Sequence, residues 1–156
     1  MVNTPDVAPS DVVDSTRSFA VTADDIDAAA RRISDVVAAT PLQYCERLSA
    51  VTGAHVYLKR EDLQIVRSYK IRGAYNLMSQ LTPKELAVGV VTASAGNHAQ
   101  GVAFACRSMK VRGRIYVPAN TPKQKRDRIL VHGGDYVELI LTGDTFDAAA
   151  AAAAAG

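Results

Sequence analysis

Apolar and polar residues alternate in regular blocks through the second half of the chain. Short apolar runs typical of buried strands are separated by stretches long enough for helices. The predicted strands are 88–92, 114–117 and 136–141, and the predicted helices are 97–109, 122–132 and the segment from Thr145 onward. Apolar strands that alternate with helices of this length predict a parallel sheet covered by helices and joined by right-handed crossovers.

Local signals mark some of these helix ends. Thr121 is predicted to cap the helix that follows it, with Pro122 as its first residue, and Gly133 is predicted to end that helix. After Asp147 the chain continues with eight alanines, which favour a last helix capped by Thr145. The predicted order of elements in this half is therefore βαβαβα.

The first half shows a less regular pattern. Thr22 is predicted to cap a helix that begins at Ala23, because apolar residues recur there at helical spacing, and Pro41 is predicted to mark its end. Residues 56–58 predict a short strand. A second helix is predicted to begin near Ser68 as its N-cap, because the apolar residues beyond it again follow helical spacing.

Lys70 stands in the first turn of this second helix, where electrostatics disfavour a cation. The partial positive charge of a helix N-terminus costs a cation roughly 0.3–1 kcal/mol, and Arg67 and Arg72 add like charge. Both effects favour the neutral amine, which is a nucleophile towards aldehydes and a base, whereas an ammonium group is neither. A solvated basic face or an anion site would explain the same three cations.

Two longer segments carry a resemblance to a known enzyme family. The first is Lys-Arg-Glu-Asp-Leu-Gln at 59–64, followed by Ser-Tyr-Lys-Ile-Arg-Gly-Ala-Tyr-Asn at 68–76. The second is Thr-Ala-Ser-Ala-Gly-Asn-His-Ala-Gln-Gly at 92–101. In this order they closely resemble motifs of the serine/threonine dehydratase family of fold type II pyridoxal-phosphate (PLP) enzymes, and the resemblance extends over about residues 21–156.

The resemblance implies a fold and a division of the chain. The expected fold class is α/β, a parallel sheet with flanking helices as in tryptophan synthase beta-like PLP enzymes. Because such enzymes are more than twice as long as these 156 residues, only the N-terminal portion is expected here. We expect a disordered leader at 1–20, opening pieces of the larger PLP domain at 21–83, including the Lys70 helix, and a smaller βαβαβα domain at 84–156, truncated at its C-terminal end.

The resemblance also implies the residues that bind PLP. Lys70 matches the family's Schiff-base lysine. Tyr69 is expected to pack against the cofactor ring, where the family often has phenylalanine. Asn97 is expected to hydrogen-bond the ring hydroxyl oxygen.

The second motif is expected to hold the substrate carboxylate, and it follows a predicted strand, where sites form in parallel sheets. Gly96 allows close approach of a ligand, and the helix N-terminus favours an anion. An ordinary strand-to-helix turn capped by Asn97 is the alternative. The residues expected around the carboxylate are Ser94, Ala95, Gly96, Asn97 and His98. Because related racemases carry serine at the position of Ala95, elimination is expected rather than racemisation.

The implied activity is that of a PLP-dependent ammonia-lyase, a threonine dehydratase. It would dehydrate and deaminate L-threonine to 2-oxobutanoate and ammonia, as in isoleucine biosynthesis. Alternatives are L-serine dehydration, another PLP-dependent β-elimination, or a non-catalytic anion-binding domain. The family's glycine-rich phosphate loop and its residue facing the pyridine nitrogen have no counterpart here, so the 156 residues alone are expected to be inactive. The intact parent is expected to be a homo-oligomer.

Composition and charge argue against several other classes of protein. A net charge of +2 and 6% aromatic residues argue against a nucleic-acid partner. Cys45 and Cys106 lack the spacing of a disulfide framework or a metal site, and no metal is expected. The absence of a membrane span or signal pattern favours a cytoplasmic protein. A solvated helix face is the expected role of the basic residues Lys123, Lys125, Arg126 and Arg128.

Overall fold

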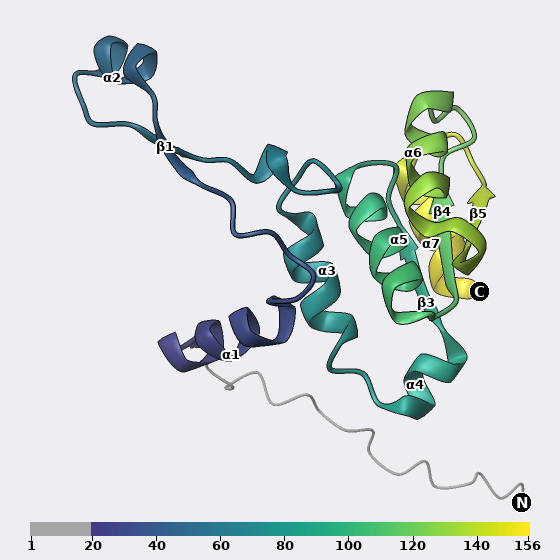
Figure 1. Cartoon of the computed structure of the whole chain (residues 1–156). Coiled ribbons are helices and arrows are strands. Elements are labelled where there is room, and N and C mark those ends of the chain that lie inside the picture. The colour runs from purple at the N-terminus through teal and green to yellow at the C-terminus, as the bar shows by residue number, and fades with distance from the viewer. Residues whose placement is uncertain (1–19) are drawn as a thin grey trace, which may run out of the picture.

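The computed structural model describes residues 20–156, so nearly all of the leader expected at 1–20 lies outside the described residues. The described part begins with α1 (Ala23–Ile33), β1 (Leu42–Tyr44), α2 (Glu46–Thr52), β2 (Tyr57–Lys59), the 3-10 helix η1 (Glu61–Leu63), α3 (Lys70–Met78) and α4 (Pro83–Val88). β1 and β2 pair antiparallel, with Leu42 opposite Lys59. The segment from β1 to β2, with α2 at its tip, extends away from the other elements (Figure 1).

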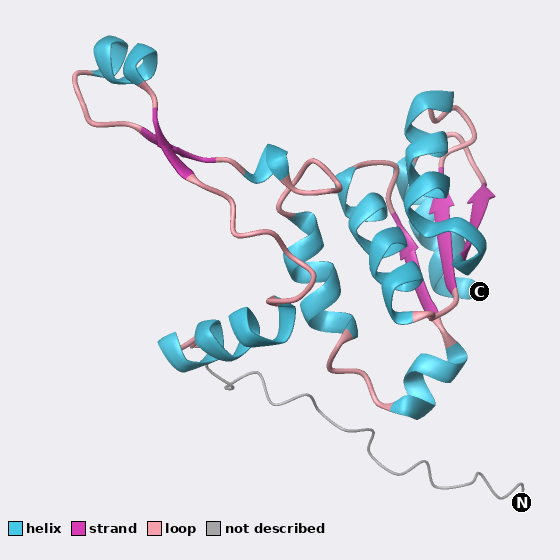
Figure 2. Ribbon diagram, viewed as in Figure 1, coloured by secondary structure: helices cyan, strands magenta, loops and turns pink. Residues whose placement is uncertain are grey.

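The second part alternates strands and helices. Its elements are β3 (Val90–Ala93), α5 (Asn97–Met109), β4 (Gly113–Val117), α6 (Lys123–Gly133), the 3-10 helix η2 (Gly134–Tyr136), β5 (Val137–Leu141) and α7 (Phe146–Ala155). The three strands form a parallel sheet in the order β3-β4-β5, shown as magenta arrows in Figure 2. The predicted parallel βαβαβα arrangement is confirmed.

Alternating residues of the central strand β4 face two different layers. Ile115 and Val117 are fully buried in an apolar cluster with residues of α5 and α6, Ala99 and Ile129 among them. Arg114, which points to the opposite face, donates a hydrogen bond of 2.6 Å to the carbonyl of Gly156, after α7. The sheet is therefore covered by α5 and α6 on one side and by α7 on the other.

Helix α3 joins the first part of the chain to this layer. Ala74 and Met78 of α3 share an apolar cluster with Val102, Ala105 and Cys106 of α5. In Figure 1 the two helices lie side by side. This packing sets the first residue of α3, Lys70, beside the first turns of α5.

Several predicted boundaries are confirmed. α5 spans Asn97–Met109 as predicted, and Thr145 caps α7 by accepting a hydrogen bond from the Ala148 N–H. Thr22 caps α1 in a reciprocal capping box with Asp25. These signals are local in sequence, which explains why the pattern alone finds them.

Three predicted boundaries are wrong. Ser68 is not the N-cap of α3, because its hydroxyl is buried without a partner among the described residues and Tyr69 takes the cap position. Thr121 does not cap α6, which begins at Lys123 with Pro122 as its N-cap. Pro41 does not end α1, which stops at Ile33, well before it.

Candidate active site

Lys70 is the first residue of α3, and its amine lies near the ring of Tyr69. Lys70 Nζ is 5.0 Å from the ring centroid, a distance at which a cation is attracted by an aromatic face. Lys70 is half-buried, whereas Tyr69 exposes 59% of its surface. The first turn of α3 contains no acidic residue and has no side-chain cap. The predicted lysine at the partially positive end of a helix is therefore confirmed.

Arg72 does not add an uncompensated charge beside Lys70, as the sequence suggested. Its Nε and Nη2 donate hydrogen bonds of 2.8 Å each to the two carboxylate oxygens of Glu61. This ion pair lowers the pKa of Glu61 to about 2, chiefly through the Arg72 hydrogen bond, and raises the pKa of Arg72. The like-charge expectation for Arg72 was wrong because its partner lies eleven residues away in the chain.

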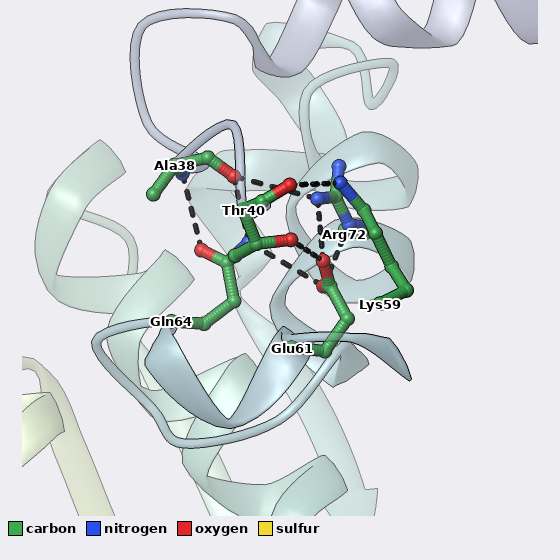
Figure 3. A network of polar contacts seen from close by, with 6 residues as sticks. All are labelled: Ala38, Thr40, Lys59, Glu61, Gln64 and Arg72. Carbon is green, nitrogen blue, oxygen red and sulfur yellow. Dashed lines mark hydrogen bonds and ion pairs between the residues drawn. The ribbon is translucent and has the colours of Figure 1, made fainter. Parts of the chain in front are cut away.

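The Glu61–Arg72 pair belongs to a larger network of polar contacts (Figure 3). The Thr40 hydroxyl donates to Glu61, and the Lys59 amine donates to the Thr40 carbonyl. Gln64 Nε2 donates to the Ala38 carbonyl at 2.8 Å, and its Oε1 accepts from the Ala38 N–H at 3.1 Å. Three residues of the Lys-Arg-Glu-Asp-Leu-Gln motif thus hold residues 38–40 against the first turn of α3.

The second predicted motif forms the turn between β3 and α5. Gly96 is the N-cap of α5 and makes no side-chain cap, and the first turn holds no acidic residue. The Gly96 N–H donates to the Ser94 hydroxyl at 3.3 Å. Asn97 and His98 are exposed, while Ala95 packs against the apolar cluster under the sheet. The N–H groups of this helix start can therefore face an anion.

The two motifs meet where α5 passes the start of α3. A Cβ placed on Gly101 would lie 3.1 Å from the carbonyl carbon and oxygen of Lys70, so the two backbones approach as closely as a glycine allows. Partial desolvation of the imidazole, and then the charge of Lys70, lower the pKa of His98, although the residue as a whole stays exposed. The structure therefore brings Lys70 and Tyr69 beside His98 and Gly101. Sequence reasoning gave Gly101 no role, although it stands in the motif.

A hollow of about 370 Å³ lies on the α6 side of the same turn. It is lined by Gly96, Asn97 and Gln100 of the α5 region and by Gln124, Lys125 and Arg128 of α6. Gln100 is only 5% exposed. Part of the α6 face expected to be solvated therefore lines this hollow. Lys125 and Arg128 add positive charge beside the Gly96–Asn97 turn.

The described residues form neither a metal site nor a disulfide. No group of three or more histidine, cysteine or acidic residues there could hold a metal ion. Both cysteines are free, and burial raises the pKa of Cys106 to about 11. From residue 20 onward, no helix is both long and apolar enough to span a bilayer.

Comparison with known protein sequences identifies the chain's relatives. The pattern of the pyridoxal-phosphate dependent enzyme family matches residues 33–155. The biosynthetic L-threonine dehydratase IlvA of Mycobacterium tuberculosis is 66% identical over 139 residues, which are 89% of this chain and 32% of that protein. The IlvA of Corynebacterium glutamicum is 65% identical over 133 residues, 85% of this chain and 30% of that protein. The chain thus spans about a third of the length of these relatives.

Solved structures show the same architecture. The processed form of threonine deaminase isoform 2 from Solanum lycopersicum superposes with a TM-score of 0.72 at 39% identity, covering 98% of this chain and 46% of that one. Maize serine racemase superposes with a TM-score of 0.78 at 30% identity, covering 85% of this chain and 39% of the racemase. The expected fold class is therefore confirmed.

Proposed function

The chain belongs to the family of pyridoxal-phosphate dependent enzymes, and from this we propose that it contributes to the dehydration and deamination of L-threonine to 2-oxobutanoate and ammonia. The observation that carries the proposal is the position of Lys70, at the start of α3 and against the start of α5. Relatives about two-thirds identical to this chain are biosynthetic threonine dehydratases. This supports a lyase of isoleucine biosynthesis rather than another PLP enzyme.

The residues around Lys70 fit PLP by their chemistry. The half-buried amine suits an aldehyde, the exposed Tyr69 ring offers a flat apolar surface, and the open α5 N-terminus suits an anion. Asn97, exposed at the first position of α5, would hydrogen-bond the ring hydroxyl. When bound, PLP would supply an electron sink for the carbanion at the substrate Cα.

The chain's own groups would then divide the remaining work. The Lys70 amine would bind the cofactor and, once the substrate's amine has displaced it, would take the proton from the substrate Cα. The N–H groups at the start of α5, together with Ser94 and His98, would hold the substrate carboxylate. The lowered pKa of His98 keeps its imidazole neutral at pH 7, so it would bind as a hydrogen-bonding group rather than as a cation.

Ala95 favours elimination over racemisation. Its methyl group packs against the apolar cluster under the sheet and offers no proton to a substrate. Reprotonation from the face opposite Lys70 therefore has no donor at this position. L-Serine is the second candidate substrate, because its hydroxyl can leave in the same way. The ratio of kcat/KM for L-threonine and L-serine distinguishes the two.

The organisation of the whole enzyme follows from the same proposal. Residues 21–83 would belong to its larger domain and residues 84–156 to the smaller one, in a cytoplasmic homo-oligomer. The 156 residues alone would lack activity, because the family's glycine-rich phosphate loop has no counterpart in them. Activity is therefore best measured with this chain in place of the aligned third of the Corynebacterium glutamicum relative.

The deciding test compares this chimera with its Lys70→Ala and Lys84→Ala variants, assayed for 2-oxobutanoate release. Lys84 is an exposed lysine of α4 and serves as the matched control. We expect the chimera and Lys84→Ala to turn over L-threonine and Lys70→Ala to lose activity by orders of magnitude. Turnover that survives Lys70→Ala would contradict the proposal.

A further inference from the structure

We propose that Glu61 is a positioning residue that fixes Lys70 by closing the loop in front of α3. The inference rests on the role proposed for Lys70 above. It concerns a residue that binds neither substrate nor cofactor in that proposal. The loop runs from Gln64 to Lys70, and Glu61 contacts Gln64 at its start and Arg72, two residues beyond its end (Figure 3).

The first contact holds the helix start. Helix α3 has no side-chain cap and no acidic residue in its first turn, so its N-terminus lacks the usual local anchors. Arg72, two residues after Lys70, instead holds both Glu61 oxygens with bonds of 2.8 Å. A bidentate pair of this kind fixes orientation as well as distance. The first turn of α3 is thereby fixed from outside the helix.

The second contact holds the other end of the loop. Gln64 Nε2 approaches Glu61 at 3.4 Å while the same side chain makes two bonds to the main chain of Ala38. Gln64 is 1% exposed, so these bonds are shielded from water. The Thr40 hydroxyl adds a further bond to Glu61. Glu61 thus accepts hydrogen bonds from the start of the loop, from the first turn of α3 and from Thr40.

The loop has few polar contacts of its own, chiefly a hydrogen bond of 2.8 Å from the Arg67 N–H to the Gln64 carbonyl. Arg67 adopts a left-handed conformation with φ of 58°. This conformation is unfavourable for a residue other than glycine, so contacts around it must compensate for the strain. The buried Ser68 hydroxyl has no partner among the described residues. Val66 is fully buried and supplies an apolar anchor. Besides Val66 and the close approach of Gly101 to the Lys70 backbone, the contacts of Glu61 are therefore the polar contacts that can hold Lys70 in position.

The neighbouring acid Asp62 provides a matched control. It lies in the same short helix and forms a comparable 2.8 Å ion pair with Arg60. Its contact with the loop is through its main-chain carbonyl, 3.5 Å from Arg67 Nη1, which Asp62→Asn keeps. Removing its charge changes the net charge as Glu61→Gln does. Any difference in behaviour between the two variants is therefore due to where the negative charge was removed and not to the change in net charge.

The experiment measures amide hydrogen exchange in the 156-residue chain and in its Glu61→Gln and Asp62→Asn variants. We expect Glu61→Gln to speed exchange about tenfold at residues 72–76, where the N–H groups of the helix start are hydrogen-bonded, with α5 unchanged, as local opening requires. Asp62→Asn should leave both regions as they are. Equal exchange in all three proteins would overturn the inference, and so would a uniform increase in Glu61→Gln, which would indicate a merely structural role.

A second readout follows Lys70 itself in the chimera described above. PLP is added, the adduct is reduced with borohydride, and peptide mass spectrometry gives the labelling of Lys70 relative to Lys84. We expect Glu61→Gln to lower this ratio several-fold and Glu61→Asp, which keeps the charge, to restore part of it. An unchanged ratio in Glu61→Gln would overturn the inference. If the unsubstituted chimera shows no preference for Lys70, the proposed function fails, and exchange alone decides the positioning role.

Discussion

Gly101 of α5 lies directly against the backbone of Lys70. A Cβ on Gly101 would stand 3.1 Å from the Lys70 carbonyl carbon and oxygen and 3.2 Å from the Ile71 nitrogen. Most contacts of a Cβ with backbone atoms are longer, so a side chain at this position would require the two backbones to shift by a few tenths of an ångström. The absence of a side chain at Gly101 thus allows the Lys70 backbone to lie this close to α5.

Gly101→Ala should therefore push α3 and α5 apart. The extra methyl group meets backbone atoms that cannot rotate away, so we expect a loss of about 1–3 kcal/mol in the free energy of unfolding. Urea denaturation measures it. The matched control is Gly73→Ala in α3, where a Cβ meets nothing within 4 Å and φ is not left-handed. There alanine should stabilise the helix by about 0.5–1 kcal/mol. Similar losses in both variants would contradict the close-approach argument.

The Glu61–Arg72 pair predicts a specific acid sensitivity. The pKa of Glu61 is about 2, below its ordinary value of 4.5, so the stability it contributes is fully present above about pH 4.5 and is lost as the pH falls through about 2. The Glu61 side chain is 16% exposed and that of Arg72 35%, so we expect a contribution on the order of 2 kcal/mol.

Urea denaturation of the unsubstituted protein and Glu61→Gln between pH 7 and pH 3 tests this. The difference between their unfolding free energies should be constant at pH 6–7 and shrink from pH 5 downwards. Asp25, Asp62 and Glu85 also have lowered pKa values, but they are present in both proteins and cancel in the difference. If the difference in unfolding free energy does not change with pH, Glu61 stabilises the protein through packing rather than through its charge.

How far the sequence predicted the structure depends on the range of each interaction. The sheet and α5 were predicted because apolar spacing and helix length are visible within short windows. Helix α4 was overlooked because its six residues show no apolar repeat, although the sequence displays the Thr82–Glu85 capping box and Pro83 at the first helical position. β1 and α2 were overlooked too, and each is short.

The site shows the same division. The two motifs singled out Lys70 and the turn at 94–98 as candidates, and apolar spacing placed Lys70 correctly at a helix start. Charge could not show that Arg72 is neutralised, because Glu61 approaches it only after the chain folds back. Likewise Ser68 looked like a cap in sequence, yet its hydroxyl turns into the interior. Contacts between residues that are brought together only by folding could not be predicted from residue spacing along the sequence.

The two cysteines should differ sharply in reactivity. Cys106 of α5 is fully buried in the apolar cluster that this helix shares with α3, and burial raises its pKa to about 11, so few molecules carry the reactive thiolate at pH 8. Cys45 is only partly buried, in front of α2. We expect a thiol reagent to label Cys45 in the native chain and both cysteines in urea, as read by peptide mass spectrometry. Labelling of native Cys106 as fast as Cys45 would show that the α3–α5 packing opens readily.

His98 offers the most direct test of the arrangement around Lys70. Its pKa is lowered first by burial and then by the positive charge of Lys70, because a nearby cation disfavours the imidazolium form. Lys70→Ala removes the second effect, so the pKa of His98 should rise in an NMR titration of the imidazole resonances. His132 is the internal control, since its pKa is lowered by burial and by Arg128 and Arg107, none of which changes. A His98 pKa that stays constant, or one that moves together with that of His132, would mean that Lys70 does not lie beside the α5 turn in solution.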